Sequence, residues 1–171
     1  MNNKSIIVFG SSRRNGFTGQ LVDEVARRQN LRVLDVSDYK MTPYDYEHHN
    51  RYDDFLPLMR DVASHDQIIL ASPVYWYTMS TQLKVFVDRW SDLLDIEKDL
   101  GRTLRGKQGL IISTGGDVRP ERCFEECFQH TFAFMGMSYG GMLYCATDSG
   151  RSFDVSTQDS TISTFGEKIL S

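Results

Sequence analysis

Short apolar runs alternate with longer stretches of helical periodicity along the chain. The short runs are rich in β-branched residues and predict five strands, at Ser5–Phe9, Leu31–Val36, Gln67–Ala71, Gly109–Ser113 and Ser138–Cys145. Their nearly continuous apolar character is typical of strands that are covered on both faces.

Helical patterns fill the gaps between these runs. Two apolar stripes have helical spacing, one made of Leu21, Val22, Val25 and Ala26, the other of Leu83, Phe86, Val87, Trp90 and Leu94. Weaker patterns predict helices at Asp54–Ser64, Pro120–Met135, with proline at the first position, and Thr157–Leu170. Strict alternation predicts an α/β fold with a parallel sheet and right-handed crossovers. Such a sheet binds its ligand outside the carboxyl ends of its strands, so we expect function in the loops after strands one, three and four.

Length and composition fit one cytoplasmic domain. A chain of 171 residues with 40% hydrophobic content is long enough for one sizeable core, so we expect a single domain over residues 1–171. A formal charge of −4 argues against a nucleic-acid or anionic-membrane surface. No apolar run approaches the roughly 20 residues that span a bilayer, so we expect no membrane segment. Three cysteines without paired spacing suit a reducing compartment.

The loop after the first strand has the composition of a phosphate site. It reads Gly10-Ser11-Ser12-Arg13-Arg14-Asn15-Gly16-Phe17-Thr18 and leads into a helix. Glycines, hydroxyls and a helix N-terminus bind phosphate well, and either arginine could balance the charge. The spacing matches neither the P-loop nor the Gly-x-Gly-x-x-Gly pattern. The alternative is a turn that merely connects strand to helix.

Three successive aromatic residues mark the loop after the third strand, Ser72-Pro73-Val74-Tyr75-Trp76-Tyr77-Thr78-Met79-Ser80. Backbone amides beside Pro73 could address a planar heterocycle while the aromatic rings exclude water. The alternative is an aromatic patch buried under the sheet edge or in a subunit contact.

The loop after the fourth strand, Ser113-Thr114-Gly115-Gly116-Asp117, has two adjacent glycines. Glycines allow a flat ring to approach the backbone closely. A plain turn explains the same residues, and only the coincidence of three loops favours a ligand.

Together these segments resemble the NADPH-dependent FMN reductase family of flavodoxin-like proteins. The strongest parts of the resemblance are Gly10 to Thr18 and the block from Ser72 to Trp76 with Ser80, Gln82-Leu83-Lys84 and Phe86 to Arg89. The resemblance implies a three-layer sandwich with a five-stranded parallel sheet in the order 2-1-3-4-5. It also implies a homodimer or homotetramer with the flavin near a subunit boundary.

The resemblance assigns site residues as well. It implies that the FMN phosphate is held by Ser11, Arg13, Asn15, Gly16, Phe17 and Thr18. The isoalloxazine would be bordered by Pro73, Val74, Tyr75, Trp76, Thr114, Gly115 and Gly116.

The resemblance also implies a reaction. Hydride would pass from NAD(P)H to FMN, and electrons would then pass to free flavin, a quinone or a similar small acceptor. No side-chain acid or base is required, because the cofactor carries the chemistry.

Other polar residues favour structural roles. We expect Cys123 and Cys127, which have phenylalanine neighbours, to pack in the core rather than bind metal. His48 and His49 are expected in a solvated loop, although the stretch Asp38–Tyr52 could also cover the flavin or contact a partner subunit. Asp35, Asp38, Asp53 and Asp54 are expected to end strands or cap helices.

Two other functions stay open at this point. An electron-carrier flavodoxin would dock protein partners without using pyridine nucleotide. Such carriers tend to be strongly acidic around the flavin, whereas this chain is only mildly negative, with a formal charge of −4. A flavin-dependent sensor could keep the fold without turnover.

Overall fold

The computed structural model describes residues 4–170. Its five strands are β1 (Ser5–Phe9), β2 (Arg32–Asp35), β3 (Gln67–Ala71), β4 (Gln108–Gly115) and β5 (Ser138–Ala146). All neighbouring strands pair in parallel, in the order β2-β1-β3-β4-β5. The predicted fold class and strand order are therefore confirmed.

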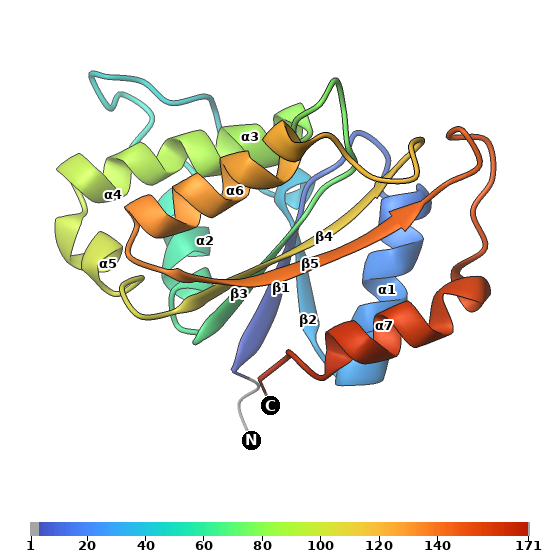
Figure 1. Cartoon of the computed structure of the whole chain (residues 1–171). Helices are drawn as coiled ribbons and strands as arrows, with labels where there is room; N and C mark the ends of the chain where they lie inside the picture. Colours follow the sequence, from blue (N-terminus) through green and yellow to red (C-terminus); the bar gives the residue numbers. More distant parts are fainter. Residues whose placement is uncertain (1–3, 171) are drawn as a thin grey trace.

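Helices cover both faces of the sheet (Figure 1). Their bounds are α1 (Phe17–Gln29), α2 (Phe55–Val62), α3 (Thr81–Asp88), α4 (Asp92–Asp95), α5 (Lys98–Arg102), α6 (Arg122–Phe134) and α7 (Asp159–Gly166). Helices α1 and α7 lie on one face, and α2 to α6 lie on the other. The three layers follow from the apolar pattern, because successive side chains of a strand point to opposite faces of the sheet. In β1, Ile6 and Val8 belong to the core under α2 to α6. Ile7 and Phe9 belong to the core under α1.

Two strand ends differ from the prediction for local reasons. The second strand ends at Asp35, whose carboxylate accepts a hydrogen bond from the Ser37 backbone N–H and starts a 3-10 turn at Val36–Asp38. The fourth strand instead continues to Gly115, because Gly115 still pairs with Ala146 of β5. This extension carries Thr114 and Gly115 to the edge of the sheet.

Three helix predictions need correction. Leu94 is 47% exposed although it belongs to the predicted apolar stripe. A 3-10 turn at Arg89–Ser91 separates α3 from α4, and its tighter winding turns Leu94 away from the face of Trp90. Pro120 precedes the N-cap Glu121 and so lies outside α6. The last helix, α7, is shorter than the predicted range because a 3-10 turn at Val155–Gln158 precedes it.

The stretch 39–54 is not a freely solvated loop. His48 is 11% exposed in its side chain and contacts two carboxylates, Asp92 through Nδ1 and Asp95 through Nε2, each at 3.0 Å. Arg89 is fully buried and binds the same stretch through Asp53 and the Thr42 carbonyl oxygen. The expectation of a solvated loop is wrong for His48 and holds only for His49, which is 81% exposed.

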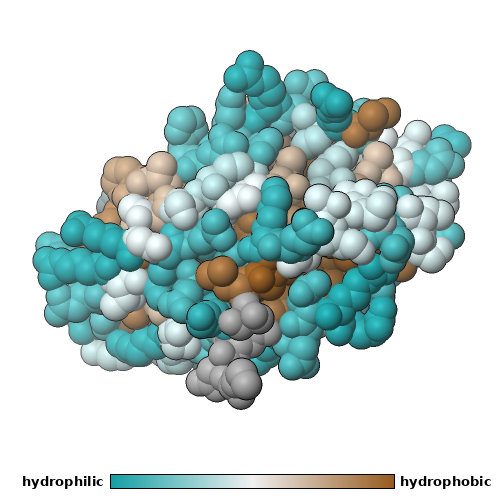
Figure 2. Space-filling view, turned by 60° about the horizontal axis from the view of Figure 1, so that its bottom comes forward, coloured by the Kyte–Doolittle hydropathy of each residue, from teal (hydrophilic) through white to brown (hydrophobic). Residues whose placement is uncertain are grey.

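The two ends of the molecule differ in character. Ser5 Oγ donates to the Leu170 carbonyl oxygen at 2.6 Å, so the two ends of the described chain meet at the amino ends of the strands. The surface on this side is mostly hydrophilic, with an apolar strip near its centre (Figure 2). The loops that follow β1, β3, β4 and β5 gather at the opposite end (Figure 1). Within residues 4–170, no helix is long and apolar enough to span a bilayer.

Candidate functional site

A cleft of about 200 Å³ opens where these four loops meet. It is lined by Ser11, Arg13, Gly16, Phe17, Thr18, Pro73, Val74, Tyr75, Thr114, Gly115, Gly116, Thr147 and Gly150. The carboxyl ends of parallel strands meet at one edge of a sheet, which brings these distant segments together.

Eleven of the thirteen predicted site residues line the cleft. Asn15 and Trp76 do not: Asn15 is exposed beside it, and Trp76 is 91% exposed at the tip of its loop. Thr147 and Gly150 line the cleft without having been predicted. The turn signal Ser149-Gly150 after the last strand could have indicated this fourth loop.

The N-terminus of α1 offers donors to an anion. Its N-cap, Gly16, supplies no side-chain hydrogen bond, and the first turn contains no acidic residue. The first backbone N–H groups of a helix have no intrahelical acceptor, and they carry partial positive charge. Ser11 and Thr18 add hydroxyl groups on the cleft wall.

The two arginines of this loop have different roles. Arg14 pairs with Asp23 at 2.6 Å and with Asp35 at 3.6 Å. The hydrogen bond to Asp23 raises the pKa of Arg14 further above its usual range. Arg13 lines the cleft, is exposed and has no carboxylate partner among the described residues. Arg13 is therefore the arginine that can meet an anion here.

A hydrogen-bond network behind the cleft fixes the loops relative to one another. Thr18 Oγ1 and Thr114 Oγ1 lie 2.7 Å apart in the core and join α1 to β4. Ser80 Oγ donates to the Gly10 carbonyl oxygen at 2.7 Å and caps α3 by accepting from the Leu83 N–H. Gly10 is required at this contact, since a Cβ there would lie 2.6 Å from the Leu83 backbone nitrogen.

The aromatic loop after β3 is a tight turn with a strained tip. Tyr75 and Thr78 exchange two backbone hydrogen bonds of 2.9 and 3.1 Å. The two residues between them, Trp76 and Tyr77, have φ of 46° and 66°, a region that costs a residue with a side chain roughly 1–2 kcal/mol. Tyr75 lines the cleft, and its hydroxyl lies 2.8 Å from Ser12 Oγ. The alternative of an aromatic patch buried under the sheet edge is wrong for Trp76 and Tyr77, which are 91% and 57% exposed. The alternative of a subunit contact stays a prediction.

Two of the three cysteines are at least partly buried. Burial raises the pKa of Cys145 to about 11 and that of Cys127 above its ordinary value. Cys123 is exposed and does not pack in the core, contrary to expectation. The part of the chain that the structure describes contains no group of three or more His, Cys, Asp or Glu side chains arranged for a metal ion.

The model of the NADPH-dependent FMN reductase family matches residues 3–150, most of the chain. The chain belongs to this family. Membership confirms the predicted enzyme class, an NAD(P)H-dependent FMN oxidoreductase, and the predicted cofactors FMN and NAD(P)H.

Individual proteins are similar to the chain in sequence or in fold. The chain is 28% identical to the NAD(P)H-dependent FMN-containing oxidoreductase YwqN of Bacillus subtilis (strain 168), over 89% of this chain and 88% of that protein. Its fold is similar to that of the Trp repressor binding protein from Bacillus subtilis, with a TM-score of 0.74, 25% identity and 98% of each chain covered. General stress protein 14 of Treponema denticola, solved in complex with FMN, shares the fold with a TM-score of 0.66 and 13% identity, over 96% of this chain and 98% of that one.

The donors of the cleft fit the cofactor of this reductase family. An uncapped helix N-terminus, two hydroxyls and Arg13 suit a phosphate group. Gly115 and Gly116 leave the facing wall without bulky side chains. The cleft is smaller than a closed ligand site of roughly 300–1,000 Å³, so a flavin would be only partly covered.

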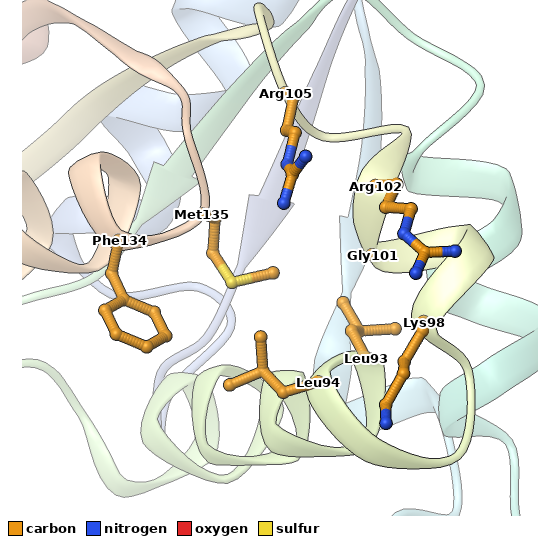
Figure 3. A pocket seen from close by; sticks show the side chains of 8 residues that line it. All are labelled: Leu93, Leu94, Lys98, Gly101, Arg102, Arg105, Phe134 and Met135. Carbon is orange, nitrogen blue, oxygen red and sulfur yellow. The ribbon is translucent and has the colours of Figure 1, made fainter.

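A second hollow of about 200 Å³ lies elsewhere on the reductase, between α4, α5 and the end of α6 (Figure 3). Leu93, Leu94, Phe134 and Met135 form its apolar side, while Lys98, Arg102 and Arg105 line the rest. It contains no predicted site residue and none of the cleft's loops.

Proposed function

We propose that the cleft binds FMN with its phosphate at the N-terminus of α1 and its isoalloxazine between the loops after β3 and β4. The supporting observation is the convergence, in one cleft, of an uncapped helix N-terminus and an arginine unpaired within residues 4–170, Arg13, with Pro73–Tyr75 and Thr114–Gly116. We further propose that the protein passes hydride from a nicotinamide to bound FMN and then electrons to free flavin, a quinone or a similar small acceptor.

The protein's own groups bind and orient in this proposal. Arg13, Ser11 and Thr18 would hold the phosphate, and the Pro73 to Tyr75 backbone would border one edge of the ring. FMN supplies the redox chemistry when it is bound. The cleft-lining residues include no His, Asp, Glu, Lys or Cys side chain, and hydride transfer to the cofactor requires none. The nicotinamide and the electron acceptor would bind one after the other at the same site, which gives ping-pong kinetics.

We also propose that the reductase is a cytoplasmic homodimer or homotetramer. Trp76, Tyr77, Leu94 and Phe134 are large apolar side chains that are 47% or more exposed, and such side chains are enriched at interfaces. Three free cysteines suit a reducing compartment. Light scattering on the purified full chain should give a mass of two or four subunits, and a monomer at micromolar concentration would contradict the assembly.

One assay tests the function. The purified full chain is incubated with FMN, separated from free flavin and examined for flavin absorbance. NADH and NADPH oxidation is then followed with free flavin, with a quinone and without acceptor. We expect bound FMN and acceptor-dependent oxidation. Failure of the folded protein to take up FMN at micromolar concentration would overturn the binding proposal, and flavin uptake without nucleotide oxidation would indicate a carrier or sensor.

A further inference from the structure

A short hairpin after β5 forms a fourth wall of the cleft. We call residues 147–152 the β5 lip. Asp148 and Ser152 pair as an antiparallel bridge, and the Arg151 N–H donates to the Asp148 carbonyl oxygen at 2.7 Å. Ser149 and Gly150 at the tip have φ of 47° and 74°, which is typical of a two-residue hairpin turn. The β5 lip is therefore an ordered element rather than an unstructured connection.

One hydroxyl ties the β5 lip to the end of β4. Thr147 donates twice to the Gly115 carbonyl oxygen, from its backbone N–H at 2.8 Å and from Oγ1 at 3.0 Å. The same Oγ1 accepts from the Gly150 N–H at 2.9 Å. A carbonyl oxygen has two lone pairs, so Thr147 occupies both acceptor positions of Gly115. Thr147 Oγ1 thus connects two cleft-lining residues, Gly115 and Gly150.

The β5 lip also lies beside the rest of the cleft wall. A Cβ on Gly116 would lie 3.6–3.7 Å from the Ser149 and Gly150 backbone, which is ordinary contact distance. After the lip, Phe153 packs its ring against that of Phe17, with centroids 5.9 Å apart. Contacts at both ends hold the lip between the Gly115–Gly116 wall and the start of α1.

We infer that Thr147 is a positioning residue for the flavin, acting through Gly115 and Gly150 at the ring side of the cleft. This inference rests on the proposed FMN site. Without Oγ1, the Gly150 N–H loses its acceptor and Gly115 loses one of its two donors. The Thr147 backbone N–H alone then joins the lip to Gly115. The Gly115–Gly116 wall beside the flavin ring then becomes mobile. Flavin binding has to order this wall again, and the entropy lost in doing so lowers the affinity.

The test compares Thr147→Val with Thr147→Ser. Valine keeps the shape of threonine and removes the hydroxyl, while serine keeps the hydroxyl. Thr164→Val is the matched control, because Thr164 Oγ1 also donates to a backbone carbonyl, that of Ser160, in the distant helix α7. Equilibrium constants for FMN and for riboflavin, which lacks the phosphate, are measured by quenching of flavin fluorescence, together with thermal unfolding of the flavin-free protein.

We expect Thr147→Val to weaken both ligands by the same factor, about tenfold, because the ring is common to them. Thr147→Ser should stay within about twofold of the starting protein, as should Thr164→Val. Equal FMN affinity in Thr147→Val and the starting protein would overturn the inference, and so would a loss confined to FMN or a loss that serine does not rescue. If the starting protein itself bound no FMN, the proposed function would fail instead.

Discussion

Arg89 lies 2.5 Å from Asp53, a residue thirty-six positions earlier in the chain, and is itself 0% exposed. Its Nε donates to Asp92, also 0% exposed, at 2.9 Å. Asp53 in turn accepts from the Phe55 N–H at the start of α2. Arg89 therefore joins the 3-10 turn after α3 to the stretch 39–54.

Replacing this buried cation should strongly destabilise the fold. Arg89→Met removes the arginine from the fully buried Asp92 carboxylate, which among the described residues keeps only its contact with His48. Breaking a buried ion pair in this way costs about 3–5 kcal/mol. Urea unfolding measures the change in the free energy of unfolding. The control is Arg60→Met, which breaks the exposed pair with Glu97 and should cost less than about 1 kcal/mol. Similar losses in the two variants would contradict the structural role of Arg89.

His48 should make the stability of the protein depend on pH. Its hydrogen bond to Asp95, supported by Asp92, raises the pKa of His48 above its usual value of 6.5. A raised pKa in the folded state means that the protonated ring stabilises the fold fully below pH 6.5, and that this contribution is lost as pH rises through the folded-state pKa. The free energy of unfolding should accordingly fall from pH 6 to pH 8.

Variants at the two adjacent histidines isolate this effect. His48→Gln should flatten the dependence in that window. His49→Gln should keep it, because the His49 side chain is 81% exposed and pairs with Asp45 alone among residues 4–170. Denaturant unfolding at several pH values provides the measurement. An unchanged slope in His48→Gln would assign the pH dependence to other groups.

Arg13 should contribute to FMN affinity through the phosphate alone. A hydrogen bond to a charged group contributes about 1.5–3 kcal/mol, so Arg13→Gln should weaken FMN binding by roughly 10- to 100-fold. Riboflavin binding should not change. The control is Arg122→Gln, at a side chain that is 91% exposed on α6. Equal losses for FMN and riboflavin would place Arg13 elsewhere than at the phosphate.

The backbone conformation of Trp76 should lower the free energy of unfolding. Its φ of 46° is unfavourable for tryptophan, and the side chain is 91% exposed, so little packing compensates. Asparagine tolerates this conformation better, and Trp76→Asn should raise the free energy of unfolding by about 0.5–1 kcal/mol. We expect acceptor turnover or subunit association to weaken at the same time, since strain of this kind is retained at functional sites.

A second exposed aromatic residue provides the comparison. Tyr52 is 87% exposed, and its φ is not among the positive values. Tyr52→Asn should therefore bring no gain in stability and no loss of turnover. A gain equal to that of Trp76→Asn would show that surface hydrophobicity, rather than backbone strain, decides the effect.

The sequence by itself determined the layered architecture. Apolar runs such as Ile6–Phe9, alternating with helical stripes, are sufficient for a doubly covered parallel sheet, because each run must be buried on two faces. The sequence also indicated one loop of the cleft, through the glycine, hydroxyl and arginine residues between Gly10 and Thr18. Backbone freedom and hydrogen-bond donors are properties of the residues themselves, so a local pattern is enough to reveal them.

Tertiary structure alone decided which groups meet. The choice between Arg13 and Arg14 depends on Asp23 and Asp35, whose carboxylates hold Arg14 outside the cleft. The burial of His48 depends on Asp92 and Asp95, more than forty positions away. Thr147 reaches the site only because β5 lies beside β4. Such long-range contacts depend on the packing of elements, which no local pattern in the sequence records.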